Sequence, residues 1–263
     1  MKELFAFEFR KLWRSKPFWI CTIVGIILNI VTVVLTYATS RLADSITGAE
    51  GMGHYPYNGI IFLRQTATGG NLVILFAIFV TLFICADFSE GTIKNILSRG
   101  FSRELLFVSK SLTIMTGGLI LGILCMAASF ATGSIIFGAG DGFDSQLIVS
   151  LLIQLLGLLA YVMLDVFLAV LFTKAGGAMT LGIILPLIVP LIAQLIDVAL
   201  THLISSLEYG DEVVVNYLLS SNMGTISSIN ATGTDFAFAA ILFTVYILLF
   251  SILGLLIMKR KEV

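Results

Sequence analysis

The chain has 263 residues and a formal net charge of −1, and hydrophobic residues make up 58% of it. This much apolar sequence in long runs excludes an ordinary soluble protein and predicts one integral membrane domain over 1–263, with no room for a soluble domain of typical size. The near-neutral charge gives no support for nucleic-acid binding.

Six apolar runs predict six transmembrane helices in an all-α fold. Each run approaches or exceeds the roughly 20 residues that a helix needs to cross the hydrocarbon core. The runs lie at 18–39, 71–86, 111–137, 147–172, 178–197 and 238–258.

The distribution of charge predicts the orientation of these helices. All lysines and arginines except Arg41 and Arg64 lie at the termini or in the second and fourth connections. By the positive-inside rule, both termini and these connections are cytoplasmic in a bacterial-type plasma membrane. In the outer segments, near 40–70, 138–146 and 198–237, the charged residues are mostly acidic.

Residues 1–17 predict an amphipathic helix at the membrane interface. Apolar side chains such as Leu4 and Leu12 fall on one arc at helical spacing, and basic side chains fall opposite. Glu8 is an exception on the apolar flank. Pro17 cannot continue this helix, so we expect the chain to turn there. The alternative is a simple basic anchor before the first span.

The connection over 87–104 is the most specific stretch of the sequence. Ser89 can cap a helix that begins at Glu90. Gly100 suits the left-handed residue that ends such a helix, and Ser102 can cap the next one. We therefore expect a short cytoplasmic helix; the alternative is a charged turn that only satisfies topology. The predicted helix covers 90–99, with Ile93, Ile96 and Leu97 on its apolar side.

The chain resembles the ABC-2 type transporter permeases, the membrane subunits of ATP-binding cassette exporters. The step Glu90-Gly91-Thr92, with the Ile-Lys-x-Ile-Leu run after it, is similar to that family's E-G-T pattern. The stretch from Gly100 to Arg103, with Lys110 beyond it, is similar to the small-Ser-Arg sequel. The resemblance implies that the residues coupled to an ATPase are Glu90, Gly91, Thr92, Lys94, Arg99 and Arg103.

The resemblance covers essentially the whole chain and also implies its architecture. Residues 1–17 would form an elbow helix, 87–104 would hold the coupling helix, and 198–237 would contain a re-entrant outer hairpin. The alternative for 198–237 is an extracellular cap that lies on the lipid headgroups.

The sequence lacks the phosphate-loop motif of nucleotide-binding subunits. It contains no G-x-x-x-x-G-K-[ST] phosphate loop, so we expect no enzyme activity and no cofactor in this chain, with ATP and Mg²⁺ bound by a separate ATPase subunit. The resemblance implies two copies of that ATPase and a second permease copy, identical or related. The only two histidines, His54 and His202, are far apart in sequence and predict no metal site.

Polar residues inside the apolar runs are the remaining candidates for a site. Because polar groups in hydrocarbon are costly, we expect them to avoid lipid. They would line a conduit or ion-coupling site, or alternatively make helix–helix hydrogen bonds. Gln154 and Asp165 are eleven residues apart and mark one face of the fourth span. The set is Asn29, Gln154, Asp165, Gln194 and Asp197.

These observations predict an exporter subunit that moves substrate outward when a partner hydrolyses ATP. One alternative is a carrier or channel that acts alone and uses Asp165 and Asp197 to couple an ion. The other is a membrane scaffold or immunity protein that transports nothing.

Overall fold

The computed structural model describes residues 2–47, 57–68, 70–140, 144–203, 213–228 and 230–260. Within these ranges the fold is all-helical, while parts of the predicted outer segments, at 48–56, 141–143 and 204–212, lie outside the described residues. The helices are α1 (Lys2–Arg14), α2 (Lys16–Thr47), α3 (Gly59–Thr68), α4 (Gly70–Ser89), α5 (Thr92–Ser98), α6 (Arg103–Phe137), α7 (Ser145–Phe172), α8 (Ala175–Leu203), the 3-10 helix η1 (Val215–Tyr217), α9 (Leu219–Ser227) and α10 (Gly233–Arg260).

Six helices in the described part of the chain are long and apolar enough to cross a membrane: α2, α4, α6, α7, α8 and α10. Each contains one of the six predicted apolar runs, which are therefore confirmed as helices. Several extend past the run, as α6 does at its start, because polar flanking residues can continue the same backbone hydrogen bonds. The chain is a multi-pass membrane protein.

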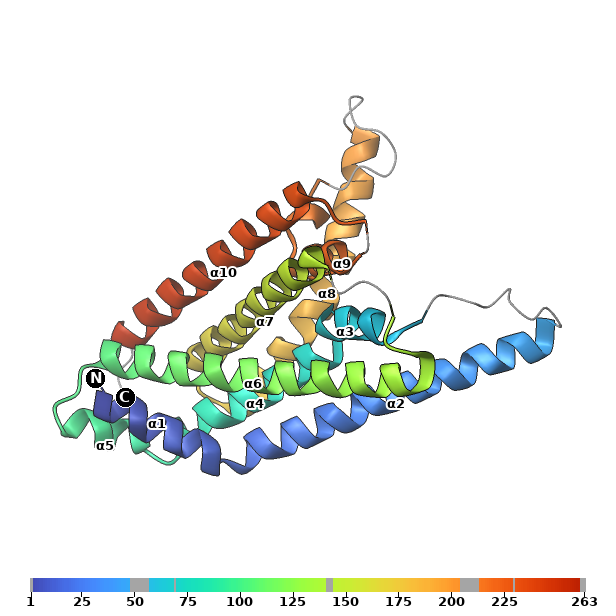
Figure 1. Cartoon of the computed structure of the whole chain (residues 1–263). Helices are drawn as coiled ribbons and strands as arrows, with labels where there is room; N and C mark the ends of the chain where they lie inside the picture. Colours follow the sequence, from blue (N-terminus) through green and yellow to red (C-terminus); the bar gives the residue numbers. More distant parts are fainter. Residues whose placement is uncertain are drawn as a thin grey trace.

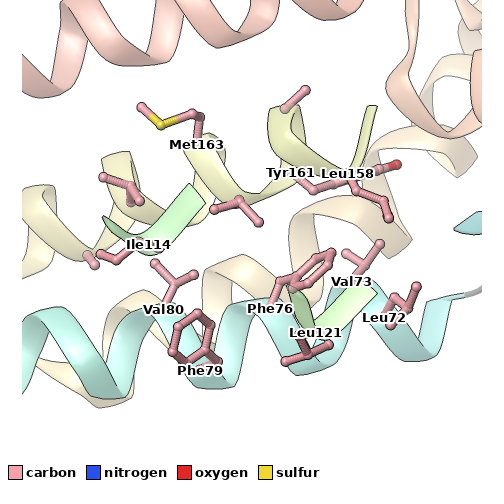
Figure 2. Close-up of a cluster of buried hydrophobic side chains, with 14 of the residues drawn as sticks. Leu72, Val73, Phe76, Phe79, Val80, Ile114, Leu121, Leu158, Tyr161 and Met163 are labelled. Atoms are coloured by element: carbon pink, nitrogen blue, oxygen red, sulfur yellow. The ribbon is translucent and has the colours of Figure 1, made fainter. Parts of the chain in front are cut away.

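The core lies between α4, α6 and α7 (Figure 2). Phe76 and Phe79 of α4, together with Leu121 of α6, are fully buried there. Gly118 of α6 lets α7 approach closely, because a Cβ at this position would lie 2.7 Å from a methyl group of Val162. Since lipid tails are as apolar as these side chains, close packing rather than removal from water holds the helices together.

The helices converge at one end of the bundle and diverge at the other. Figure 1 shows both chain termini beside α1 and α5 at the converging end, while α2 and α8 point away from each other at the opposite end. Both termini therefore lie on the same side of the bundle, as an even number of crossings requires.

The connection between α1 and α2 differs from the prediction. Helix α1 ends at Arg14, and only Ser15 separates it from α2. Pro17 therefore lies in the first turn of α2, where a residue without an N–H group is tolerated. The chain turns just before the proline and not at it.

The predicted orientation can be tested by labelling single cysteines in intact cells. In a background without the three native cysteines, Ser45→Cys and Ser145→Cys should react with a membrane-impermeant thiol reagent, and Ser98→Cys should react only after permeabilisation. All three serines are exposed in the structure, so access depends on the side of the membrane. Strong labelling of Ser98→Cys in intact cells would contradict the six-span topology.

Candidate functional site

Helix α5 is reached through a tight turn at Gly91. Helix α4 ends at Ser89, whose hydroxyl donates to the Ala86 carbonyl at 2.9 Å and does not cap the next helix, so the predicted cap is wrong. Gly91 has a φ of 68°, a left-handed conformation that glycine adopts without the steric cost of a Cβ. Because Glu90 belongs to this exposed turn, α5 begins at Thr92, two residues later than predicted.

The end of α5 follows the predicted pattern closely. The helix ends at Ser98, one residue before the predicted end. Gly100 has a φ of 87° and occupies the expected left-handed position. The Ser102 hydroxyl accepts a hydrogen bond from the Leu105 N–H at 3.2 Å, which confirms it as the cap of α6.

Helix α5 turns its apolar side to the bundle and its polar side outward. Ile93 and Ile96 are buried, and Leu97 packs against the core while partly exposed. Lys94 and Arg99 are exposed. The predicted two-sided character of the helix is confirmed, and its exposed side carries cations.

At the same end of the bundle, four charged side chains from three helices form a charge cluster: Glu8, Lys11, Asp87 and Lys110. Asp87, near the end of α4, accepts hydrogen bonds from Lys11 of α1 and Lys110 of α6. Lys110 also donates to the two carboxylate oxygens of Glu8 at 3.0 and 3.1 Å. Glu8, Asp87 and Lys110 are only 0, 1 and 6% exposed.

The charge cluster fixes α1 against the two helices that flank α5. Buried charges of opposite sign compensate one another only while their geometry is kept, so removing one partner leaves another uncompensated. The Phe83 ring adds a contact, since its centroid lies 5.0 Å from the Lys11 ammonium and 5.5 Å from that of Lys110. The arrangement joins α1 to the ends of α4 and α6, and α5 joins this block through its contacts with α4.

The structure also connects the start of α6 to the end of α10. The Arg103 guanidinium donates to the Lys259 carbonyl at 3.3 Å, and the Lys259 ammonium lies 2.7 Å from a Glu104 carboxylate oxygen. Of the six predicted coupling residues, Arg103 is thus the one tied to another spanning helix.

The polar residues predicted inside the spans do not gather in one place. Gln154 and Asp165 both face the protein interior, at 0 and 2% exposed. Within the described ranges, both polar atoms of the Gln154 amide and Oδ2 of Asp165 have no hydrogen-bond partner. Asn29 is buried and donates to the Gly25 carbonyl of its own helix at 2.8 Å.

Asp197 and Gln194 near the end of α8 behave differently from each other. Asp197 is buried, and its two carboxylate oxygens accept the N–H groups of Val214 and Val215 at 2.7 and 2.9 Å. It therefore anchors η1 to α8. Gln194 is exposed on α8 in the single chain, so its sheltering from lipid stays a prediction.

The segment after α8 packs against α7 and α10. The Tyr246 hydroxyl donates to the Tyr217 carbonyl at 3.0 Å. The Tyr217 ring also lies 5.9 Å from the ring of Phe238, five residues into α10, so the segment lies beside the first half of that helix. At the other end of this segment, the Ser150 hydroxyl donates to the Ile226 carbonyl at 2.6 Å, near the start of α7.

Helix α3, which the sequence analysis assigned only to an outer segment, packs against α6 and α9. Its Arg64 is buried and donates to the Ser228 carbonyl at 3.1 Å. Burial lowers the pKa of the Arg64 guanidinium, and the charge of Asp144 acts in the opposite direction. In the sequence, the only indication of this contact was Arg64 itself, a single arginine in an apolar stretch.

A family model described as a protein of unknown function, DUF2705, matches residues 22–263. The chain belongs to the DUF2705 family. No curated protein matches it. The matched range includes Asp87 and Lys110 of the charge cluster, whereas Glu8 and Lys11 precede it. DUF2705 carries no described activity, so the contacts above are the basis for assigning one.

Proposed function

We propose that the chain is the membrane permease subunit of an ABC-2 type exporter, which moves substrate outward when a separate subunit hydrolyses ATP. The observation that carries this proposal is the attachment of α5. Ile93 and Ile96 seat it on the bundle, and the charge cluster holds the adjoining ends of α4 and α6 against α1. A short helix with an exposed cationic side on such a block is suited to receive a push from a soluble partner.

The same proposal assigns roles to the other elements. Helix α1 is the elbow helix, and α5 is the coupling helix. The segment of η1 and α9 is the re-entrant hairpin, supported by the contacts of Tyr217 with Tyr246 and Phe238 in the apolar run of α10. Irregular backbone at such depth is tolerated where it is packed on protein, as this segment is on α7 and α10.

In this mechanism the chain performs no chemistry and transmits movement. A partner that contacts Glu90, Lys94 and Arg99 displaces α5, and the turn at Gly91 passes the displacement to α4. The contacts of Arg103 carry it through α6 to α10. ATP and Mg²⁺ bind to two copies of the partner, and a second permease copy completes the assembly in the plasma membrane.

Cross-linking at α5 tests the presence of this partner. Asn95 is exposed on α5, so Asn95→Cys carrying a photoactivatable cross-linker should capture a polypeptide with a phosphate loop in membranes of cells that express the chain. The matched control is Ser45→Cys, which lies near the last residue of α2, at the end of that helix far from α5. It should capture no such polypeptide. Recovery of no ATPase at Asn95, with the chain correctly inserted, would contradict the proposal.

One observation favours the alternative of an ion-coupled carrier. Asp165 is buried in the bundle with one oxygen unpartnered, and α8 lies close enough that a Cβ on Gly182 would approach its Oδ1 to 2.6 Å. A carrier would need this carboxylate to bind its driving ion. A permease driven by ATP would need only a packing group at this position.

The two functions predict different results for Asp165→Asn, which is nearly isosteric. We expect the variant to keep most of its ATP-driven uptake of fluorescent amphiphilic dyes into inside-out vesicles, with ion gradients collapsed by ionophore. Complete loss of transport in a variant that is inserted at wild-type level would favour the ion-coupled carrier.

A further inference from the structure

Three pockets follow one another along α10. The first, of about 300 Å³, lies between α7, α8, α10 and the start of α9. The second, of about 410 Å³, follows α10 and shares Tyr246 with the first. The third, of about 500 Å³, shares Tyr217 and Phe238 with the second. Each pocket therefore adjoins the next along α10, and the three together are called the track.

The polarity of the track changes along its length. The first two pockets are lined almost entirely by apolar side chains, such as Phe167 of α7, Pro186 of α8 and Phe250 of α10. Their only polar groups are hydroxyls. The third pocket, at the start of α10, is lined by amides, hydroxyls and one carboxylate: Asn216, Asn222, Thr225, Thr234 and Asp235.

The charge of the track is negative at its polar end. Among the described residues that line the three pockets, Asp235 is the only charged one. Its Oδ2 accepts the N–H and the hydroxyl of Thr232 at 2.9 and 2.7 Å, which hold the carboxylate in place. The rings of Tyr217 and Phe238, 5.9 Å apart, line the same pocket and can contact a cation.

These properties define the chemistry of a ligand. A molecule that reaches the apolar pockets between spanning helices must be soluble in hydrocarbon, and their size is that of a small-molecule site. The polar end excludes a purely apolar molecule, and its carboxylate disfavours an anionic head.

We infer that the track binds one single-chain amphiphile with a positively charged head. The head lies near Asp235, and the chain passes Tyr246 into the first pocket. This binding site depends only on the geometry of the track, so it stands whether or not the chain is an exporter.

Photolabelling with a dodecylamine that carries a diazirine at its chain end tests the site. With the protein in nanodiscs of zwitterionic phospholipid, we expect saturable labelling of the peptide that contains Val245 and Tyr246, which line the second pocket roughly 15 Å along α10 from Asp235 and so within reach of a twelve-carbon chain. Unlabelled dodecylamine should compete, and dodecanoate, of equal chain length and opposite charge, should not. Unsaturable labelling, labelling elsewhere, or equal competition by dodecanoate would overturn the inference.

Two variants locate the head. Asp235→Asn keeps an oxygen for the Thr232 contacts and should weaken dodecylamine competition by about threefold, the size expected of a solvent-accessible charge pair. Asp144→Asn removes an exposed carboxylate at the start of α7 that does not line the track, and should change nothing. Equal effects of the two variants would show that Asp235 does not hold the head. The comparison of dodecylamine with dodecanoate uses the wild-type protein, so it does not depend on either variant.

Discussion

Lys110→Met is expected to lower the free energy of unfolding by roughly 3–5 kcal/mol, the usual cost of removing one partner from a buried ion pair. Methionine fills a similar volume but leaves the buried Glu8 carboxylate without the ammonium that contacts both of its oxygens. The measurement is thermal or chemical unfolding of the purified protein in one detergent.

The matched control is Lys259→Met, which removes a lysine from a pair with Glu104. These side chains are 47 and 53% exposed, so the expected change is below about 1 kcal/mol. A double variant of Glu8→Gln with Lys110→Met should lose less stability than Lys110→Met alone, because no uncompensated charge remains at Glu8. Equal melting of Lys110→Met and wild type would show that the charge cluster does not hold α1 in place.

Gly91→Val is expected to weaken coupling about tenfold while leaving the protein inserted. A β-branched side chain at a φ of 68° is strained by about 1–2 kcal/mol or more, so the turn from α4 into α5 should be rebuilt. Since about 1.4 kcal/mol corresponds to a tenfold change, we expect stimulation of the partner's ATP hydrolysis to fall by about tenfold.

Gly91→Asn is the control for this turn, because asparagine visits the left-handed region far more readily than valine. A Cβ at Gly91 meets no other atom within 4 Å, so added bulk alone should be tolerated. Asparagine should therefore keep most of the coupling. If valine and asparagine stimulate the ATPase equally, the conformation of the Gly91 turn has no part in coupling.

Local sequence patterns were sufficient to predict the spanning helices. Length and apolarity decide whether a helix can cross a membrane, and both are read from contiguous residues. The ends of α5 were placed within two residues because Gly100 and Ser102 act on their immediate neighbours. Ser89 was misassigned because a serine can bond backward to its own helix as readily as it caps the next one.

The charge cluster could not be predicted, because its pairs are distant in sequence. Glu8 and Lys110 are 102 residues apart, and Lys11 and Asp87 are 76 apart. The position of Glu8 on the apolar face of its helix indicated that this carboxylate needed a partner. It did not indicate which residue the partner was. The burial of Gln154 and Asp165 followed from the cost of polar groups in hydrocarbon, whereas their missing partners depend on the packing of neighbouring helices.

The rate of ATP hydrolysis by the partner captured at Asn95 tests the central proposal most directly. The partner should be reconstituted in proteoliposomes with the wild-type chain, with the Gly91→Val chain, and without either, after ion gradients are collapsed. The proposal predicts that the wild-type chain changes the hydrolysis rate and supports ATP-dependent dye movement, and that the Gly91→Val chain changes the rate about tenfold less. Dye movement by the wild-type chain alone, driven by an ion gradient without ATP or partner, would contradict it.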